Sequence, residues 1–243
     1  MIKKFLTKDG LTVPAVTREQ MIEVDRIAVE ETGPNLYQMM ENAGRNLALN
    51  VIDLIEEKSP GKKVLIFAGT GGNGGGGICA ARHLLNHGYE PIVILSNEEK
   101  MRDIPAYQLE IFRKAGGQII PIEKANDINP DIIVDAIIGY SLISAPGGKV
   151  LEMINFINKN NIPTISLDIP TGVLATSGEN PGEFVKPDKT ITLALPKTGL
   201  SPEKCGEIIL ADIGIPQVVY EKIGLKYNSP FTDKYIIPIS VME

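Results

Sequence analysis

Two aspartates and a glycine-rich stretch are the residues of this sequence best suited to chemistry. Asp135 ends the apolar run 132–134, and Asp168 ends the run 165–167. The stretch Gly69–Gly77 holds seven glycines, one threonine and a single Asn73. Carboxylates serve as general acids and bases, and glycines let backbone N–H groups approach an anion. Each aspartate alone could equally cap a helix or a turn, but together the three segments predict one polar pocket.

The glycine stretch partly fits two phosphate-binding motifs. Gly69, Gly71 and Gly74 have the spacing of the dinucleotide fingerprint, which also needs an acid at the end of the next strand. That strand ends in Leu95-Ser96-Asn97, which disfavours an ordinary Rossmann dehydrogenase. Because Ile78 follows Gly77 where a Walker A loop needs lysine, that motif is excluded. A tight turn without a ligand remains an alternative.

The two histidines of the chain give little support for metal or nucleophilic chemistry. His83 and His87 are four residues apart, as in a metal-binding helix, but Leu84 stands where a zinc protease needs glutamate. No third ligand is indicated. One histidine near the sheet and one at a helix C-terminus is the simpler interpretation. The scarcity of histidine also disfavours a Ser-His-Asp or Cys-His arrangement.

Alternating strands and helices must position these residues. Short apolar runs of the kind that form buried parallel strands cover 64–68, 91–95, 131–135, 163–168 and 190–195. Helical segments at 78–86, 106–115 and 150–159 lie between them. Two helices precede them, one capped by Thr17 with Gln20 and one after Pro34. We predict one domain over residues 1–243, a three-layer αβα sandwich with a Rossmann-like, mostly parallel sheet and two extra N-terminal helices. Residues 1–15 and 227–243 are predicted to be peripheral tails.

Composition narrows the partners and the compartment. The net charge is −6, and clustered Lys and Arg for nucleic acid binding are missing. No stretch approaches the ~18 apolar residues of a membrane span, and the first ten residues do not resemble a signal peptide. With only two cysteines, Cys79 and Cys205, a reducing cytoplasmic setting is the expectation.

Several motifs, in order, resemble those of a known family. They are AVTREQMIEVDRIAVEETG, NLYQMMENAGRNLA, AGTGGNGGGGICAARHL, VDAIIGYSL and SLDIPTGVLATSGENPGEFVKPDKTITLALPKTGL, followed by GEIILADIGIP. The sequence resembles the NAD(P)H-hydrate epimerases, also called the YjeF N-terminal domain family, over roughly residues 16–224. Asp-Ile-Pro-Thr-Gly and Pro-Lys-x-Gly-Leu are the more specific pieces.

The resemblance implies an isomerase. Such enzymes interconvert the R and S forms of NADHX and NADPHX, in which water has added to the nicotinamide ring. A separate dehydratase consumes the S form. The resemblance also implies a homodimer through the N-terminal helices and one K⁺ per subunit.

The family pattern also assigns roles to individual residues. It implies that Asn73, Asp135 and Thr171 hold the potassium ion through oxygen atoms. It implies that Asp168 is the catalytic acid and base, while Lys197 is either a second polar group or a surface residue. The implied substrate-binding residues are Gly72, Asn73, Gly74, Gly75, Gly76, Gly139, Tyr140, Ser141, Leu142, Ile143, Ser144, Ala145 and Asp168.

The sequence departs from the family pattern in two loops. Gly72 and Gly76 stand where the family has Asn and Asp, and Ser141 replaces a usual Gly. Losing one charged hydrogen bond would weaken substrate binding by ~1.5–3 kcal/mol. Some proteins of this fold, such as an mRNA-decapping scaffold protein, have lost the reaction. The alternative is therefore a nucleotide-binding or dimer scaffold, or a pocket retuned to another nucleotide.

Overall fold

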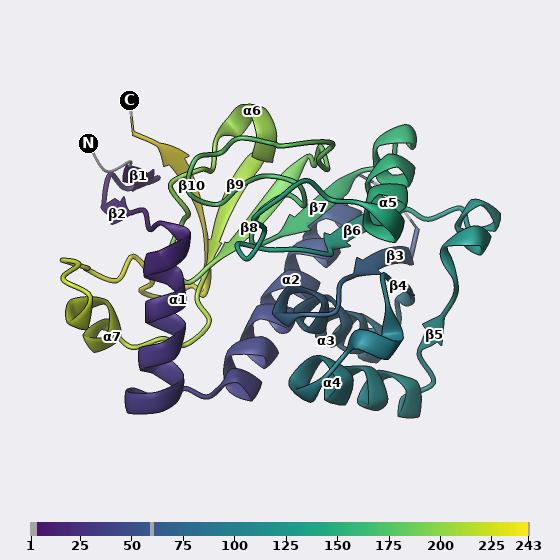
Figure 1. Cartoon of the computed structure of the whole chain (residues 1–243), viewed down its shortest axis with the longest axis horizontal. Coiled ribbons are helices and arrows are strands. Elements are labelled where there is room, and N and C mark those ends of the chain that lie inside the picture. Colours follow the sequence, from purple (N-terminus) through teal and green to yellow (C-terminus); the bar gives the residue numbers. More distant parts are fainter. Residues whose placement is uncertain (1–3, 59–60, 243) are drawn as a thin grey trace.

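Ten strands of the described chain form one sheet. The structure is a computed structural model that describes residues 4–58 and 61–242. The sheet has the order β2-β1-β10-β9-β8-β7-β6-β3-β4-β5 (Figure 1). The strands are β1 (Lys4–Thr7), β2 (Thr12–Pro14), β3 (Lys63–Ala68), β4 (Glu90–Leu95), β5 (Gln118–Ile119), β6 (Ile132–Ala136), β7 (Thr164–Leu167), β8 (Lys189–Leu193), β9 (Glu207–Ala211) and β10 (Ile236–Val241).

In the sheet order, all strands from β9 through β8, β7, β6, β3 and β4 to β5 pair in parallel. Their arrangement fixes where a ligand can bind. β3 pairs with β4 on one side and with β6 on the other, so the strand order reverses between β3 and β6. Phe67 of β3 lies opposite Asp135 of β6, and Asp135 lies opposite Ser166 of β7. In such sheets ligands bind beyond the carboxyl ends of the strands, at the point where the order reverses. The glycine stretch and both aspartates lie at this point.

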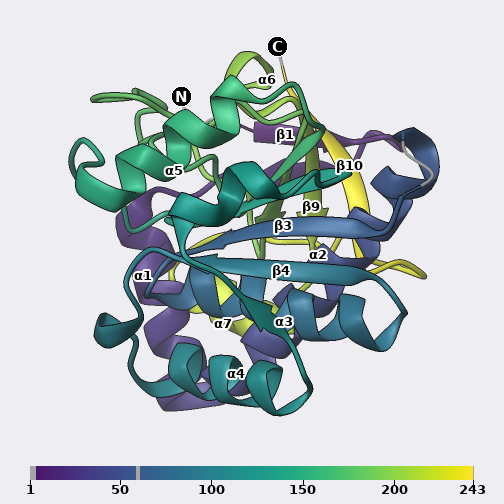
Figure 2. The same ribbon diagram turned by 90° about the vertical axis from the view of Figure 1, so that its right-hand side faces the viewer.

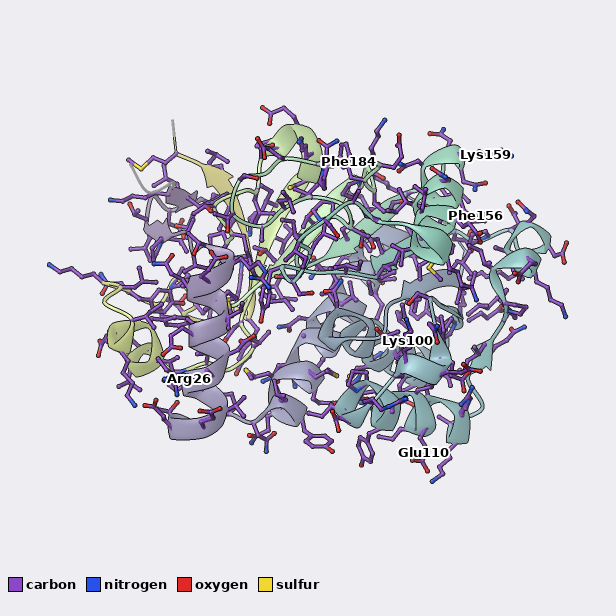
Figure 3. The ribbon with its side chains drawn as sticks, in the orientation of Figure 1. Arg26, Lys100, Glu110, Phe156, Lys159 and Phe184 are labelled. Carbon is purple, nitrogen blue, oxygen red and sulfur yellow. The ribbon has the colours of Figure 1, made fainter. Side chains whose placement is uncertain are left out.

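Helices cover both faces of the sheet, as the alternating pattern predicts. Figure 2 shows α5 on one side of β3 and β4, and α3 and α4 on the other. Phe156 of α5 packs against Phe67 of β3 with ring centroids 5.5 Å apart (Figure 3). The helices are α1 (Arg18–Ile27), α2 (Leu36–Lys58), α3 (Gly72–Asn86), α4 (Asp103–Lys114), α5 (Gly148–Lys159), α6 (Pro202–Cys205) and α7 (Gln217–Lys222). A five-residue π-helix, Ala28–Thr32, follows α1.

The two end segments differ from the prediction of peripheral tails. β1 pairs with β10 and β2, and β10 pairs with β9, all antiparallel. Phe5 and Val13 are fully buried, and Ile239 is nearly so. Each of these short strands buries a single residue, so the sequence shows little apolar alternation there, and Pro238 is exposed within β10. These edge strands extend the sheet away from the site.

α1 has the capping box that the sequence predicts. The Thr17 hydroxyl accepts the Gln20 backbone N–H, and the Gln20 side chain accepts the Thr17 N–H. Across the described residues, no helix combines the length and apolar character that crossing a bilayer demands.

Candidate active site

A cavity of about 810 Å³ opens at the carboxyl ends of β3, β6 and β7. Its wall includes most residues of the predicted substrate site, namely Gly72, Asn73, Gly76, Gly139, Tyr140, Ser141, Leu142, Ile143, Ser144 and Asp168. Gly74, Gly75, Ala145, Asp135 and Thr171 do not line it. Lys100 and Arg102, from the segment between β4 and α4, add positive charge to the wall (Figure 3 labels Lys100).

The glycine stretch is not a loop that precedes a helix, because α3 begins at Gly72. Its glycines instead allow close packing. A Cβ at Gly69 would lie 1.8 Å from the Ile137 carbonyl oxygen, and a Cβ at Gly74 would lie 1.9 Å from the Gly69 oxygen. A Cβ at Gly77 would lie 2.5 Å from the Ala136 Cβ. The helix N-terminus therefore sits directly on the sheet, with its partial positive charge at the cavity.

Asp168 sits in a strained turn at the end of β7. Its φ is +70°, and the Ile169 N–H donates to the Leu167 carbonyl at 2.9 Å, which makes Asp168 the centre of a γ-turn. Only 5% of its side chain is exposed. One carboxylate oxygen accepts the Tyr140 backbone N–H at 3.0 Å, and the other accepts Lys197 Nζ. Strained residues of this kind cluster at functional sites.

Lys197 is a buried residue of the cavity wall and not a surface residue. Its side chain is 1% exposed. Sequence alone left its place open because the isolated motif Pro-Lys-x-Gly-Leu carries no apolar periodicity. A lysine inside a run otherwise built of Leu, Pro and Gly is the one signal that pointed to burial.

Asp25 was missed by the sequence analysis and also lines the cavity. The Tyr140 hydroxyl donates to its carboxylate, which joins α1 to the segment after β6. Burial raises the pKa of Asp25 above its ordinary value of 3.8, although the hydrogen bond from Tyr140 opposes this. The same burial raises the pKa of Tyr140. The available signal was position, since Asp25 lies four residues after Met21 on the buried face of α1.

Asp135 lies behind the cavity and is fully buried. One carboxylate oxygen accepts the Thr171 hydroxyl at 2.6 Å and the Ile137 N–H at 3.3 Å. The other accepts the Ser166 hydroxyl at 2.8 Å and the Thr171 N–H at 2.9 Å. Burial raises the pKa of this carboxyl above 3.8, against the pull of these donors. The described residues give Asp135 no ion-pair partner.

Asn73 lies at the cavity with one unsatisfied amide atom. Its Nδ2 is buried and has no hydrogen-bond partner in the described chain. A Cβ at Gly139 would lie 3.1 Å from Asn73 Oδ1 and 2.8 Å from Asp168 Oδ2, so only glycine fits between these side chains. Amide, carboxylate and hydroxyl oxygens are the ligand types that a hard cation prefers, and of Asn73, Asp135 and Thr171 only Asn73 lines the cavity.

A second polar cluster lies outside the cavity. Glu41, Cys79 and His83 place ligand atoms within 4.8 Å of one another. Arg82 donates to both Glu41 oxygens at 2.7 Å, and His83 Nε2 lies 2.8 Å from Glu41. Burial raises the pKa of Cys79 to about 12 and lowers that of His83. Arg82 therefore pairs with the Glu41 carboxylate that a metal ion would need as a ligand. His87 is not part of the cluster.

Known proteins match this chain in sequence and in fold. A family model described as "YjeF-related protein N-terminus" matches residues 36–199. The chain belongs to this family. An NAD(P)H-hydrate epimerase of Dehalogenimonas lykanthroporepellens is 48% identical over 244 residues, covering 100% of both chains.

Other family members are built into longer chains. A bifunctional NAD(P)H-hydrate repair enzyme Nnr of Moorella thermoacetica is 36% identical over 219 residues, which cover 83% of this chain but 41% of that protein. The crystal structure of yeast ynu0, YNL200c, superposes with a TM-score of 0.80 at 24% identity, covering 93% of this chain and 100% of that one. The latter likeness establishes the shared YjeF-related fold.

Proposed function

We propose that this protein epimerises the R and S forms of NADHX and NADPHX. The observation that carries the proposal is a buried, strained carboxylate, Asp168, facing a cavity that a YjeF-related glycine segment borders. The full-length relative named an NAD(P)H-hydrate epimerase supports the same activity.

Asp168 is the proposed acid–base group. The carbon that inverts carries a hydroxyl and a ring nitrogen, so it can lose water or open the ring and then close on the other face. Either route needs a proton delivered and a proton taken back. The Tyr140 N–H holds the carboxylate in one orientation, and only 5% of the Asp168 side chain is exposed to solvent.

The cavity suits a dinucleotide. Its volume lies within the ordinary range for small-molecule sites. The N-terminus of α3 can receive a phosphate, and Lys100 and Arg102 supply cationic partners from the opposite segment. The segment Gly139–Ala145 closes the other side, with Ile143 75% exposed at its tip.

We propose that one potassium ion binds per subunit through Asn73, Asp135 and Thr171. The fully buried Asp135 carboxylate, which has no ion-pair partner among the described residues, supports this assignment. A bound cation would supply fixed positive charge beneath the substrate. The residues that hold it also connect β6 to the turn after β7.

We also propose a homodimer and a functional link to a dehydratase in the cytoplasm. Ile22 and Val29 near α1, and Leu36 and Tyr37 at the start of α2, are more than 40% exposed and give the N-terminal helices an apolar outer surface. The bifunctional relatives support the link, because their names join repair activities in one chain.

Incubation of the purified protein with R-NADHX in potassium buffer tests the activity. Chromatography that separates R from S should show conversion well above the spontaneous background. A folded protein that leaves the R form at the background rate would contradict the proposal and favour a binding scaffold.

A further inference from the structure

The contacts of the Lys197 ammonium group are those expected of a proton donor that lies beside Asp168. Its Nζ donates to Asp168 and, at 2.9 Å, to the Leu193 carbonyl. The described residues offer the third ammonium proton no acceptor, only the face of the Tyr140 ring 5.8 Å away. Since Lys197 lines the cavity, that proton is the one available to a ligand.

The main chain around Lys197 is fixed from two sides. The Val16 N–H donates to the Pro196 carbonyl and the Thr198 N–H donates to the Val16 carbonyl, each at 2.9 Å. These bonds form a bridge between Val16 and Lys197, just before the helix that carries Asp25. The lysine backbone therefore has little freedom to withdraw from the cavity.

The two strands that carry the pair end in matching strained turns. Ala194 has a φ of +63°, and the Leu195 N–H donates to the Leu193 carbonyl at 2.8 Å. The γ-turn at Asp168 repeats this arrangement on the neighbouring strand β7. Neither residue is glycine, so each turn is unfavourable on its own. One turn presents the carboxylate and the other presents the carbonyl that holds Lys197.

Stability alone does not account for this arrangement. Burying a lysine and an aspartate together gains little, because the loss of hydration offsets their attraction. An apolar pair of the same size would pack at least as well. Two strained turns and a buried ion pair at the floor of a cavity point to use in a reaction.

We propose that Lys197 is a second catalytic residue, which donates the proton that Asp168 later recovers. This inference rests on the proposed epimerase function. It gives the two groups separate roles, with Lys197 as the acid and Asp168 as the base.

The protons balance over one turnover by the dehydration route. The Lys197 ammonium protonates the substrate hydroxyl, the C–O bond breaks with its electron pair leaving on water, and the ring nitrogen lone pair forms a C=N bond. Water then adds to the opposite face, and its proton passes to the Asp168 carboxylate. Direct contact lets Asp168 return that proton to the Lys197 amine.

The ring-opening route uses the same two groups, with Asp168 taking the hydroxyl proton and Lys197 protonating the ring nitrogen as its bond to carbon breaks. On reclosure the ring nitrogen returns its proton to Lys197, and Asp168 protonates the new hydroxyl.

Two substitutions at Lys197 and one control at another lysine separate proton donation from charge. Lys197→Met should lower kcat by about 10²–10⁴-fold, the usual effect of removing a general acid. Lys197→Arg keeps the positive charge and the ion pair but does not release a proton, so it should lose nearly as much. Lys159→Met, at an exposed position on α5 (Figure 3), is the matched lysine control.

Amine rescue keeps the test decisive even if a substitution loosens the fold. Ethylamine or propylamine added to Lys197→Ala should restore turnover in proportion to concentration, whereas methylguanidine should not. Thermal melting and binding of NADH, as an unreactive analogue, establish that each variant is folded and loaded.

The outcomes distinguish this inference from the function on which it rests. Wild-type protein that converts R-NADHX, together with inactive Lys197→Arg and amine rescue, supports the role as donor. An active wild type with a Lys197→Arg variant within threefold of it would overturn the donor role. A wild type that does not convert R-NADHX would overturn the proposed function and this inference with it.

Discussion

Asp135, next to the last residue of β6, and Asp168, the residue after β7, lie at the ends of neighbouring strands, yet their surroundings differ. Asp135 accepts hydrogen bonds from Ile137, Ser166 and Thr171, all within the protein. Among the described residues, the Asp168 carboxylate accepts only from Lys197 and the Tyr140 N–H, and it faces the cavity. A carboxylate that accepts four hydrogen bonds from the protein fixes the structure around it, whereas one that accepts two and lines a cavity can take a proton from a ligand.

The difference arises in the turns that follow the two strands. After β6 the chain stays close enough for the Ile137 N–H to reach back to Asp135. After β7 the positive φ of Asp168 turns its side chain out of the sheet and toward Lys197. The sign of one backbone angle therefore separates the two roles.

The largest stability effect should come from Asp135→Ala. It leaves the Thr171 and Ile137 N–H groups and two hydroxyls without their acceptor, which should destabilise the fold by about 3 kcal/mol or more. For a chain of this size that corresponds to a fall in Tm of about 6–12 °C. Thermal denaturation measures it, with Asp168→Asn for comparison, because asparagine keeps one acceptor oxygen and fewer protein donors meet Asp168 than Asp135 in the described residues. Equal falls in Tm for the two variants would erase the distinction between them.

Potassium should raise the Tm of the wild-type protein through Asp135, by less than Asp135→Ala lowers it. If Asp135 helps to hold the ion, Tm should be higher in potassium chloride than in choline chloride of equal ionic strength. A potassium concentration a hundredfold above the Kd would raise the free energy of unfolding by about 2.7 kcal/mol. Asp135→Asn should remove the difference and Asp168→Asn should keep most of it. A wild-type Tm that is the same in both salts would contradict the potassium assignment.

Asp25 is a third buried carboxylate, and its contribution to stability should depend on pH. Its pKa is raised in the folded state, so the folded protein holds that proton more tightly than the unfolded chain. Stability from this group therefore falls as pH rises from 3.8 through the raised pKa. Asp25→Asn removes that fall, so its Tm relative to wild type should be higher at pH 7 than at pH 4. A difference in Tm that is independent of pH would contradict this.

The smallest effect should come from restoring a family residue at the rim. A Cβ at Gly72 meets no atom within 4 Å, so Gly72→Asn fits without displacing its neighbours. One added hydrogen bond to the substrate would lower KM by up to about tenfold. Ser177→Asn, at an exposed position away from the cavity, is the matched control. An unchanged KM would show that position 72 does not contact the substrate.

The order of strands and helices was predictable, and the fold class is confirmed. The apolar runs at 64–68 and 91–95 match β3 and β4 within one residue, since buried parallel strands have few alternatives. The start of α3 was wrong by six residues, because seven glycines predict a loop unless their packing against the sheet is known.

The candidate site was predictable only where residues belong to recognisable strand ends. Asp168 could be placed at the pocket from its strand end, whereas the segment 139–144 was placed there by the family resemblance alone. Asp25 could not, because its partner Tyr140 lies 115 residues away and only the fold joins them. The burial of Lys197 depends on the bridge to Val16, which is even more distant in sequence.

The most direct test of the account is the turnover of Asp168→Asn on pure R-NADHX, beside wild type and with binding of NADH measured on both. The account predicts that Asp168→Asn binds the analogue within a few fold of wild type and converts R to S about 10²–10⁴-fold more slowly. A variant that binds and still turns over at the wild-type rate would show that the reaction does not use this carboxylate.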